Sequence, residues 1–121
     1  MKILIIEDDV FVQKFYKTQL EEHGHQTEIA ANGKEGLEKV KSYKPDVVLL
    51  DIIMPIKDGF QVLEELKKNG GVQNLNVLVF STLGQEKDVK RALELGAKDY
   101  VNKSYFDLNV LLTKISQVVK K

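Results

Sequence analysis

Apolar residues in this chain gather in short runs that are rich in Val, Ile and Leu and bounded by turn-forming residues. A run of this kind predicts a strand that is buried on both faces. The predicted strands are Lys2–Ile6, Thr27–Ala30, 46–50, Val77–Phe80 and Tyr100–Val101. The first, third and fourth are the most apolar, so we expect them in the centre of a sheet. The second is the most polar and is expected at an edge.

Helical spacing, with apolar residues three or four positions apart, separates these strands. The predicted helices are Val10–Glu22, a helix after Asn32-Gly33, a helix between Gly59 and Asn69, Gln85–Leu95, and a last helix from Leu108 to about Val119, which Asp107 can cap. Strands that alternate with helices of this length predict βαβ units. The chain is therefore expected to form an α/β fold with a parallel sheet and helices on both faces.

Composition limits the possible functions. With 121 residues, the chain is expected to form one domain over residues 1–121. Its 18 basic and 18 acidic residues cancel, so the basic surface of a nucleic-acid-binding protein is missing. The absence of cysteine excludes disulfides, thiolate nucleophiles and cysteine-based zinc sites. No apolar stretch approaches the roughly 20 residues that span a bilayer, and the amino terminus lacks the pattern of a signal peptide. We therefore expect a cytoplasmic protein that binds neither nucleic acid nor membrane.

Polar residues stand at the ends of the predicted strands. They are Glu7, Asp8 and Asp9 after the first strand, Asp51 after the third, Ser81 and Thr82 after the fourth, and Asn102, Lys103 and Ser104 after the fifth. The carboxyl ends of parallel strands share one rim of a sheet, where open α/β proteins place their chemistry. Crowded carboxylates repel one another, and a cation with a preference for oxygen ligands, such as Mg²⁺, would offset this repulsion. A carboxylate nucleophile, a divalent cation, a lysine and a hydroxyl are the groups that phosphoryl transfer to aspartate requires.

Four segments, taken in order, resemble the motifs of the response-regulator receiver domain, the phosphoacceptor module of two-component signalling and chemotaxis. They are Ile5-Ile6-Glu7-Asp8-Asp9, the block from Asp51 to Gly59, the pair Ser81-Thr82, and the block from Gly96 to Lys103. The resemblance covers essentially the whole chain. It implies a flavodoxin-like (βα)5 fold whose five-stranded parallel sheet has the strand order 2-1-3-4-5.

The same resemblance implies a phosphorylation site around Asp51. Asp51 would accept a phosphoryl group from a histidine kinase or a phosphotransfer protein. Asp8 would bind Mg²⁺ directly, Glu7 would act through a metal-bound water, and the backbone carbonyl of Ile53 would complete the protein ligands with Asp51. Such a domain assists its own phosphorylation and dephosphorylation but turns over no external substrate, so we do not expect an enzyme.

Three further positions match residues that respond to the phosphoryl group in the family. Ser81 would supply the contacting hydroxyl, Lys103 would pair with the phosphoryl group, and Tyr100 would change rotamer when the hydroxyl moves. The implied switch is read out on the face formed by the fourth helix, the fifth strand and the fifth helix. This face would contact a downstream protein target or an effector domain, and could support a dimer linked to phosphorylation.

Several assigned residues have simpler interpretations. Glu7 and Asp8 could cap the first helix, since acids favour helix amino termini, although Asp9 fits this role better. Thr82 could replace Ser81 as the phosphate contact, although the strand register favours Ser81.

Other polar and aromatic residues also have structural interpretations. Tyr100 could be an ordinary half-buried strand residue, and Asp51 itself could act as a cap. Gly59 is interpreted as easing the turn into a helix, while Lys57 and Asp58 are interpreted as loop charges without a chemical role.

Three departures from the family pattern bear on phosphorylation. Ser104 stands where the family commonly has proline, and the peptide bond before that proline is often cis. A cis bond between Lys103 and Ser104 would cost about 3–4 kcal/mol. This peptide bond is therefore either strained or trans. Thr82 is bulkier than the small residue often found at its position. Ile53 and Leu83 are apolar and flank the implied path of the hydrolytic water. We therefore predict a comparatively long-lived phosphorylated form.

Functions of other classes fit the sequence less well. A flavodoxin-like cofactor binder needs a phosphate loop where this chain has three consecutive acids, and an aspartate-based phosphatase usually has a second acid at the position of Ile53. The remaining alternative is a degenerate receiver that acts as a phosphorylation-independent protein-interaction module. The chain ends just after the fifth helix, as expected of a stand-alone receiver or of one domain from a longer protein. Tyr105 and Phe106 could face a partner or close the core.

Overall fold

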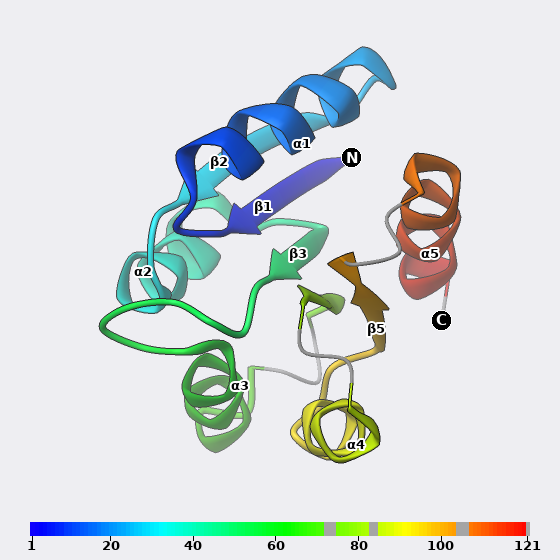
Figure 1. The fold of residues 1–121 in the computed structure, drawn as a ribbon. Helices are drawn as coiled ribbons and strands as arrows, with labels where there is room; N and C mark the ends of the chain where they lie inside the picture. Colours follow the sequence, from blue (N-terminus) through cyan, green and yellow to red (C-terminus); the bar gives the residue numbers. More distant parts are fainter. Residues whose placement is uncertain (72–74, 83–84, 104–106, 121) are drawn as a thin grey trace.

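Five parallel strands and five helices alternate along the part of the chain that the structure describes. The computed structural model describes residues 1–71, 75–82, 85–103 and 107–120. The strands are β1 (Lys2–Ile6), β2 (Gln26–Ala30), β3 (Val47–Leu50), β4 (Val77–Ser81) and β5 (Asp99–Asn102). The helices are α1 (Val10–Glu22), α2 (Gly33–Tyr43), α3 (Gly59–Lys68), α4 (Glu86–Glu94) and α5 (Leu108–Lys120). The strands form one sheet in the order β2-β1-β3-β4-β5, which confirms the predicted fold (Figure 1).

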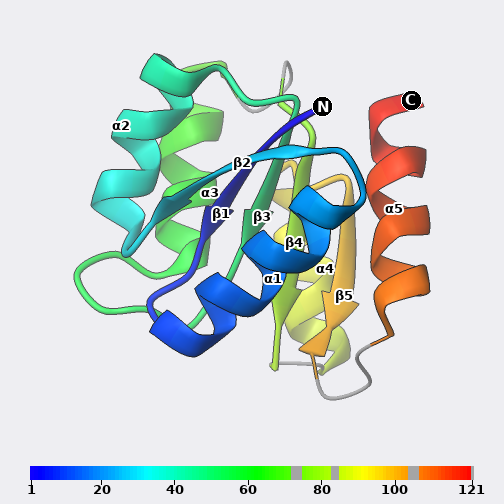
Figure 2. The ribbon, with the colours of Figure 1, turned by 90° about the horizontal axis from the view of Figure 1, so that it is seen from above.

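Helices cover both faces of the sheet (Figure 1, Figure 2). Helices α1 and α5 pack against strand residues such as Ile3, Leu49 and Phe80. Helices α2, α3 and α4 lie on the opposite face, which carries Leu4 and Val48. Successive residues of a strand point to opposite faces, so strands buried on both sides need apolar residues at nearly every position. Among the described residues, no helix combines the length and the apolar composition needed to cross a bilayer.

The most polar strand, β2, lies at one edge of the sheet, as predicted, and β5 lies at the other. The strand bounds differ by about one residue from those expected. The largest consequence is at β4, which extends to Ser81 and pairs there with Asn102 of β5. The ladder between β1 and β3 aligns Ile6 with Leu50, so these two central strands end level with each other.

Acidic side chains begin several helices. Asp9 Oδ1 accepts a hydrogen bond from Val12 N at 3.1 Å, which confirms Asp9 as the cap of α1. Asp58 accepts from Gln61 N at 2.8 Å while the Gln61 side chain accepts from Asp58 N at 2.9 Å, forming a capping box at α3. Asp107 accepts hydrogen bonds from the first turn of α5, as predicted. Asp58, which was expected to be a loop charge, therefore has a structural role.

Candidate functional site

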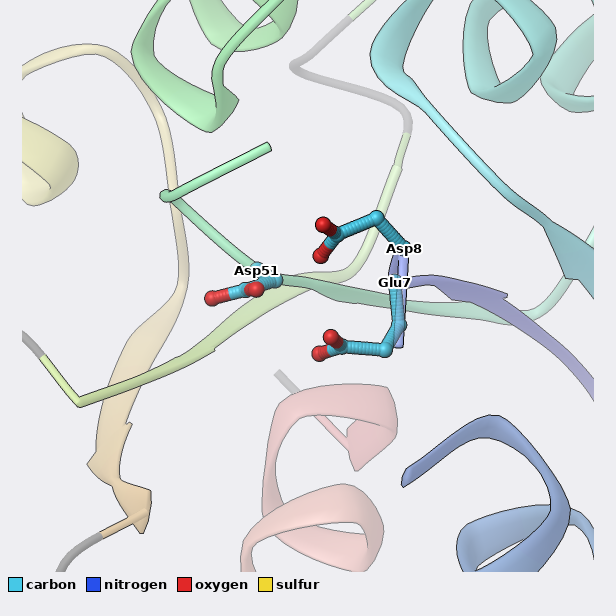
Figure 3. A group of neighbouring side chains, drawn as sticks. All are labelled: Glu7, Asp8 and Asp51. Atoms are coloured by element: carbon cyan, nitrogen blue, oxygen red, sulfur yellow. The ribbon is translucent and has the colours of Figure 1, made fainter. Parts of the chain in front are cut away.

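Three carboxylates meet where β1 and β3 end. Because Ile6 pairs with Leu50, the residues that follow them, Glu7 and Asp51, lie side by side. In the part of the chain that the structure describes, one carboxylate oxygen from each of Glu7, Asp8 and Asp51 lies within 4.8 Å of the other two. Figure 3 shows the three side chains turned toward a common space. Glu7 and Asp51 are only 4% and 7% exposed, whereas Asp8 faces solvent.

Lys103 brings a positive charge to this cluster from the end of β5. Its Nζ donates a hydrogen bond to Glu7 Oε2 and lies 3.5 Å from Asp51 Oδ2. The same ammonium group lies over the ring of Phe80, 5.3 Å from the ring centroid. The side chains of Lys103, Glu7 and Asp51 are largely shielded from water, so their attraction is stronger than that of a surface ion pair.

Burial is the main influence on the ionisation of Glu7. Burial raises the pKa of Glu7 from 4.5 to about 7; the hydrogen bond from Lys103 opposes this rise, and the charge of Asp51 adds to it. The hydrogen bond from Lys103 therefore does not fully offset the cost of charging this buried carboxylate, and a cation nearby would favour its charged form. The available donors are hard carboxylate oxygens, which are the ligands that Mg²⁺ takes in proteins. The residues present thus fit a Mg²⁺ ion held by Glu7, Asp8 and Asp51.

The loop after Asp51 is held close to the end of β3. Asp51 N donates to the Ile6 carbonyl at 3.0 Å, Ile52 N donates to Asp51 Oδ1 at 2.8 Å, and Gly59 N donates to the Ile52 carbonyl at 2.8 Å. A Cβ at Gly59 would lie 2.5 Å from the Asp51 carbonyl oxygen. Glycine is therefore needed at position 59 because α3 begins in contact with the loop, a reason that the turn alone did not suggest.

Ser81 and Tyr100 lie on neighbouring strands near this rim. Ser81 is the last residue of β4 and is fully buried, whereas Thr82, which follows it, is exposed. Tyr100 is half-buried on β5. Burial raises the pKa of its hydroxyl, and a hydrogen bond with Ser81 acts in the opposite direction. The structure thus places Ser81, and not Thr82, inside the protein and in contact with Tyr100.

The residues assigned to the lifetime of the phosphoryl group are described only in part. Ile53 is 56% exposed, and Thr82 is also at the surface. Leu83, the Lys103–Ser104 bond, Tyr105 and Phe106 fall outside the described residues.

Gln13 is a residue at the site that the sequence analysis did not single out. Its side chain is buried on α1, and its Nε2 donates a hydrogen bond to the Glu7 carbonyl oxygen at 2.6 Å. The available signal was weak: Gln13 and Leu20 are seven positions apart and share a helix face, so a polar residue stands on the buried stripe.

Comparisons with known proteins agree with this geometry. The family model of the response regulator receiver domain matches residues 3–116. The protein PilH of Pseudomonas aeruginosa is 37% identical over 118 residues, which cover 98% of this chain and 97% of PilH. The chemotaxis protein CheY of Halobacterium salinarum is 33% identical over 104 residues, covering 86% of this chain and 85% of that protein. The solved complex of CheX, CheY, BeF3 and Mg²⁺ from Borrelia burgdorferi includes a chain that is 32% identical, with a TM-score of 0.91 and coverage of 100% of this chain and 90% of that one. The chain therefore belongs to the response regulator receiver domain family.

Proposed function

We propose that this domain, spanning residues 1–121, is a signalling switch that is turned on when Asp51 accepts a phosphoryl group in the presence of Mg²⁺. The observation that carries the proposal is the contact of Lys103 with both Glu7 and Asp51, which puts a cation and two buried carboxylates at one strand-end rim. The donor is a histidine kinase or a phosphotransfer protein, as the family membership suggests. The protein acts in the cytoplasm and turns over no external substrate.

Asp51 is the nucleophile in this proposal. Its Oδ1 accepts a hydrogen bond from Ile52 N, so the carboxylate plane is held and Oδ2 is the oxygen on the side of Lys103. Oδ2 attacks the phosphorus atom, the bond from phosphorus to the donor's imidazole nitrogen breaks, and the imidazole takes up a proton. The negative charge of the new acyl phosphate then lies beside the Lys103 ammonium group.

Glu7, Asp8 and Asp51, with the backbone carbonyl of Ile53, are the residues that would hold Mg²⁺. When bound, this ion supplies positive charge that offsets the phosphoryl oxygens. Asp8 is the exposed member of the group and the natural first contact for a cation that arrives from solvent. Glu7 is buried and its Oε2 is hydrogen-bonded to Lys103, and in this proposal it acts on the ion through a metal-bound water, as the family membership suggests.

Ser81 and Tyr100 form the switch in this proposal. The Ser81 hydroxyl moves to contact the phosphoryl group, and its hydrogen bond with Tyr100 is exchanged for that contact. Tyr100 then changes rotamer, which alters the face formed by α4, β5 and α5. That face binds a downstream target or an effector domain and is the place for any dimer linked to phosphorylation. Exposed Ile53 and Thr82, together with Leu83, set how long the phosphoryl group persists.

Phosphorylation by acetyl phosphate in Mg²⁺ tests the proposal. Asp51→Asn should abolish incorporation of phosphate into the protein. Asp58→Asn is the matched control and should be labelled normally, because asparagine also serves as a helix cap. Equal labelling of wild type and Asp51→Asn, or no labelling of wild type at all, would favour the alternative of a phosphorylation-independent interaction module.

A further inference from the structure

Helix α1 directs two polar side chains toward the protein interior beside Glu7. Gln13 and Tyr16 are one helical turn apart, and both are buried. Burial, together with the charge of Glu7, raises the pKa of the Tyr16 hydroxyl. Gln13 makes the direct contact, a hydrogen bond of 2.6 Å from Nε2 to the Glu7 carbonyl oxygen. Burying an amide side chain is costly unless it is hydrogen-bonded, and Gln13 finds its partner in the Glu7 carbonyl oxygen.

The Glu7 carbonyl lies where the backbone ladder of β1 ends. The Ile6 carbonyl, one residue earlier, accepts from Asp51 N at 3.0 Å, and Glu7 N donates to the Ala30 carbonyl at 3.0 Å. The Glu7 carbonyl takes its hydrogen bond from the Gln13 side chain instead of from a neighbouring strand. The hydrogen bond from Gln13 thus holds the main chain in place one residue beyond the end of β1.

The Glu7–Asp8 peptide links two of the three clustered carboxylates. A peptide unit is planar, so holding its carbonyl oxygen also sets the directions in which the two Cα atoms carry their side chains. On the other side of this peptide, Asp9 N donates to Glu7 Oε1 at 3.2 Å and so holds the Glu7 carboxylate. Gln13 holds the main chain while Asp9 holds the side chain.

We infer that Gln13 is a positioning residue for Mg²⁺ binding: it orients the Glu7–Asp8 peptide and so sets the Mg²⁺ concentration at which Asp51 becomes phosphorylated. This inference rests on the proposed function. An amide suits the role because it donates a hydrogen bond to the carbonyl oxygen without adding a charge to the carboxylate cluster. Groups that orient metal ligands typically change metal affinity by about 10- to 100-fold when they are removed.

Titration of the purified metal-free protein with MgCl₂, followed by calorimetry, tests this inference. Gln13→Met keeps the length of the side chain and removes the donor, so its Mg²⁺ dissociation constant should rise by about 10- to 100-fold. Gln13→Asn, whose amide is one methylene too short to reach, should change the constant in the same direction and serves if the methionine variant does not fold. Gln19→Met, six residues further along α1, is the matched control and should bind Mg²⁺ like wild type.

Phosphorylation rates separate positioning from a general loss of structure. With acetyl phosphate as donor, Gln13→Met should need more Mg²⁺ for half-maximal rate but reach a similar rate at saturation. Unchanged Mg²⁺ affinity in both Gln13 variants would overturn the inference and leave the proposed function standing. A wild-type protein that binds no Mg²⁺ would overturn the inference and the proposed function together. If Gln13→Met lowered the maximal phosphorylation rate but left the Mg²⁺ concentration for half-maximal rate unchanged, this result would also count against a positioning role for Gln13.

Discussion

Lys103 Nζ lies 3.5 Å from Asp51 Oδ2, although β4 stands between the strands that these two residues follow, β5 and β3. The lysine side chain spans this distance because the strand ends lie on one rim and the ring of Phe80 supports its ammonium group. The same nitrogen also donates a hydrogen bond to the carboxylate of Glu7, the residue that follows β1. One lysine therefore contacts residues that follow two different strands. A metal ion held by the three carboxylates would lie close to the lysine's positive charge.

Lys103→Met should separate metal binding from phosphorylation. Loss of the ammonium group leaves the carboxylates more negative, so Mg²⁺ should bind more tightly at pH 8. Phosphorylation by acetyl phosphate should nevertheless slow by on the order of 100-fold, because the transferred group loses a stabilising charge. Calorimetry and labelling kinetics measure the two effects. Lys114→Met, which breaks an ion pair of 2.8 Å with Asp99, is the control and should change neither property. Weaker Mg²⁺ binding in Lys103→Met would contradict this account.

Glu7 should make the stability of the metal-free protein depend on pH. Burial raises its pKa from 4.5 to about 7 in the folded state. Between these values the folded protein holds a proton that the unfolded chain has released, so stability falls as the pH rises through this window. Glu7→Gln should remove this contribution, and its advantage over wild type should grow from pH 4.5 to 7 and then level off. Urea unfolding in EDTA measures the difference, with exposed Glu22→Gln as the control. If the free energies of unfolding of wild type and Glu7→Gln ran parallel from pH 4.5 to 7, the ionisation of Glu7 would not destabilise the folded protein.

Ile53→Asn should shorten the life of the phosphorylated protein. The side chain of Ile53 is 56% exposed, so asparagine fits there without a packing change and can orient an attacking water molecule. We expect decay to accelerate by about tenfold, less than the roughly 10²- to 10⁴-fold effect of a positioned general base. Decay of labelled phosphate after donor removal is the measurement. Ile56→Asn, another exposed apolar position of the same loop, is the control. Decay of wild type within seconds would refute the expected long lifetime.

Ile56→Asn should stabilise the protein. Ile56 has a φ of 69°, a conformation that is costly for a β-branched residue and easier for asparagine. Its side chain is 70% exposed, so little packing is lost on substitution. We expect a gain of about 1 kcal/mol in the free energy of unfolding. Urea denaturation measures it, and Ile53→Asn serves as the control without a positive φ. A loss of stability in Ile56→Asn would mean that the isoleucine side chain makes a contact worth more than the strain.

Much of the fold was predictable from local patterns. Continuous apolar runs identified β1, β3 and β4, because strands buried on both faces tolerate few polar residues. The polar character of β2 predicted its place at an edge. Asp9 and Asp107 were expected as caps because their position before a helix is a local property. Asp58 was interpreted as a loop charge although Asp58 and Gln61, three residues apart, have the spacing of a capping box, which is a local signal.

The sequence by itself determined which chemical groups reach the rim: parallel strands end on one side of the sheet, and Glu7, Asp8, Asp51, Ser81 and Lys103 follow or close those ends. Tertiary structure alone decided which of these groups touch and what their environment is. The hydrogen bond between Lys103 and Glu7 joins residues 96 positions apart, and the one from Gln13 depends on how α1 packs on β1. Such contacts, and the raised pKa of Glu7, arise from burial and from distances between elements, which no local pattern of residues specifies.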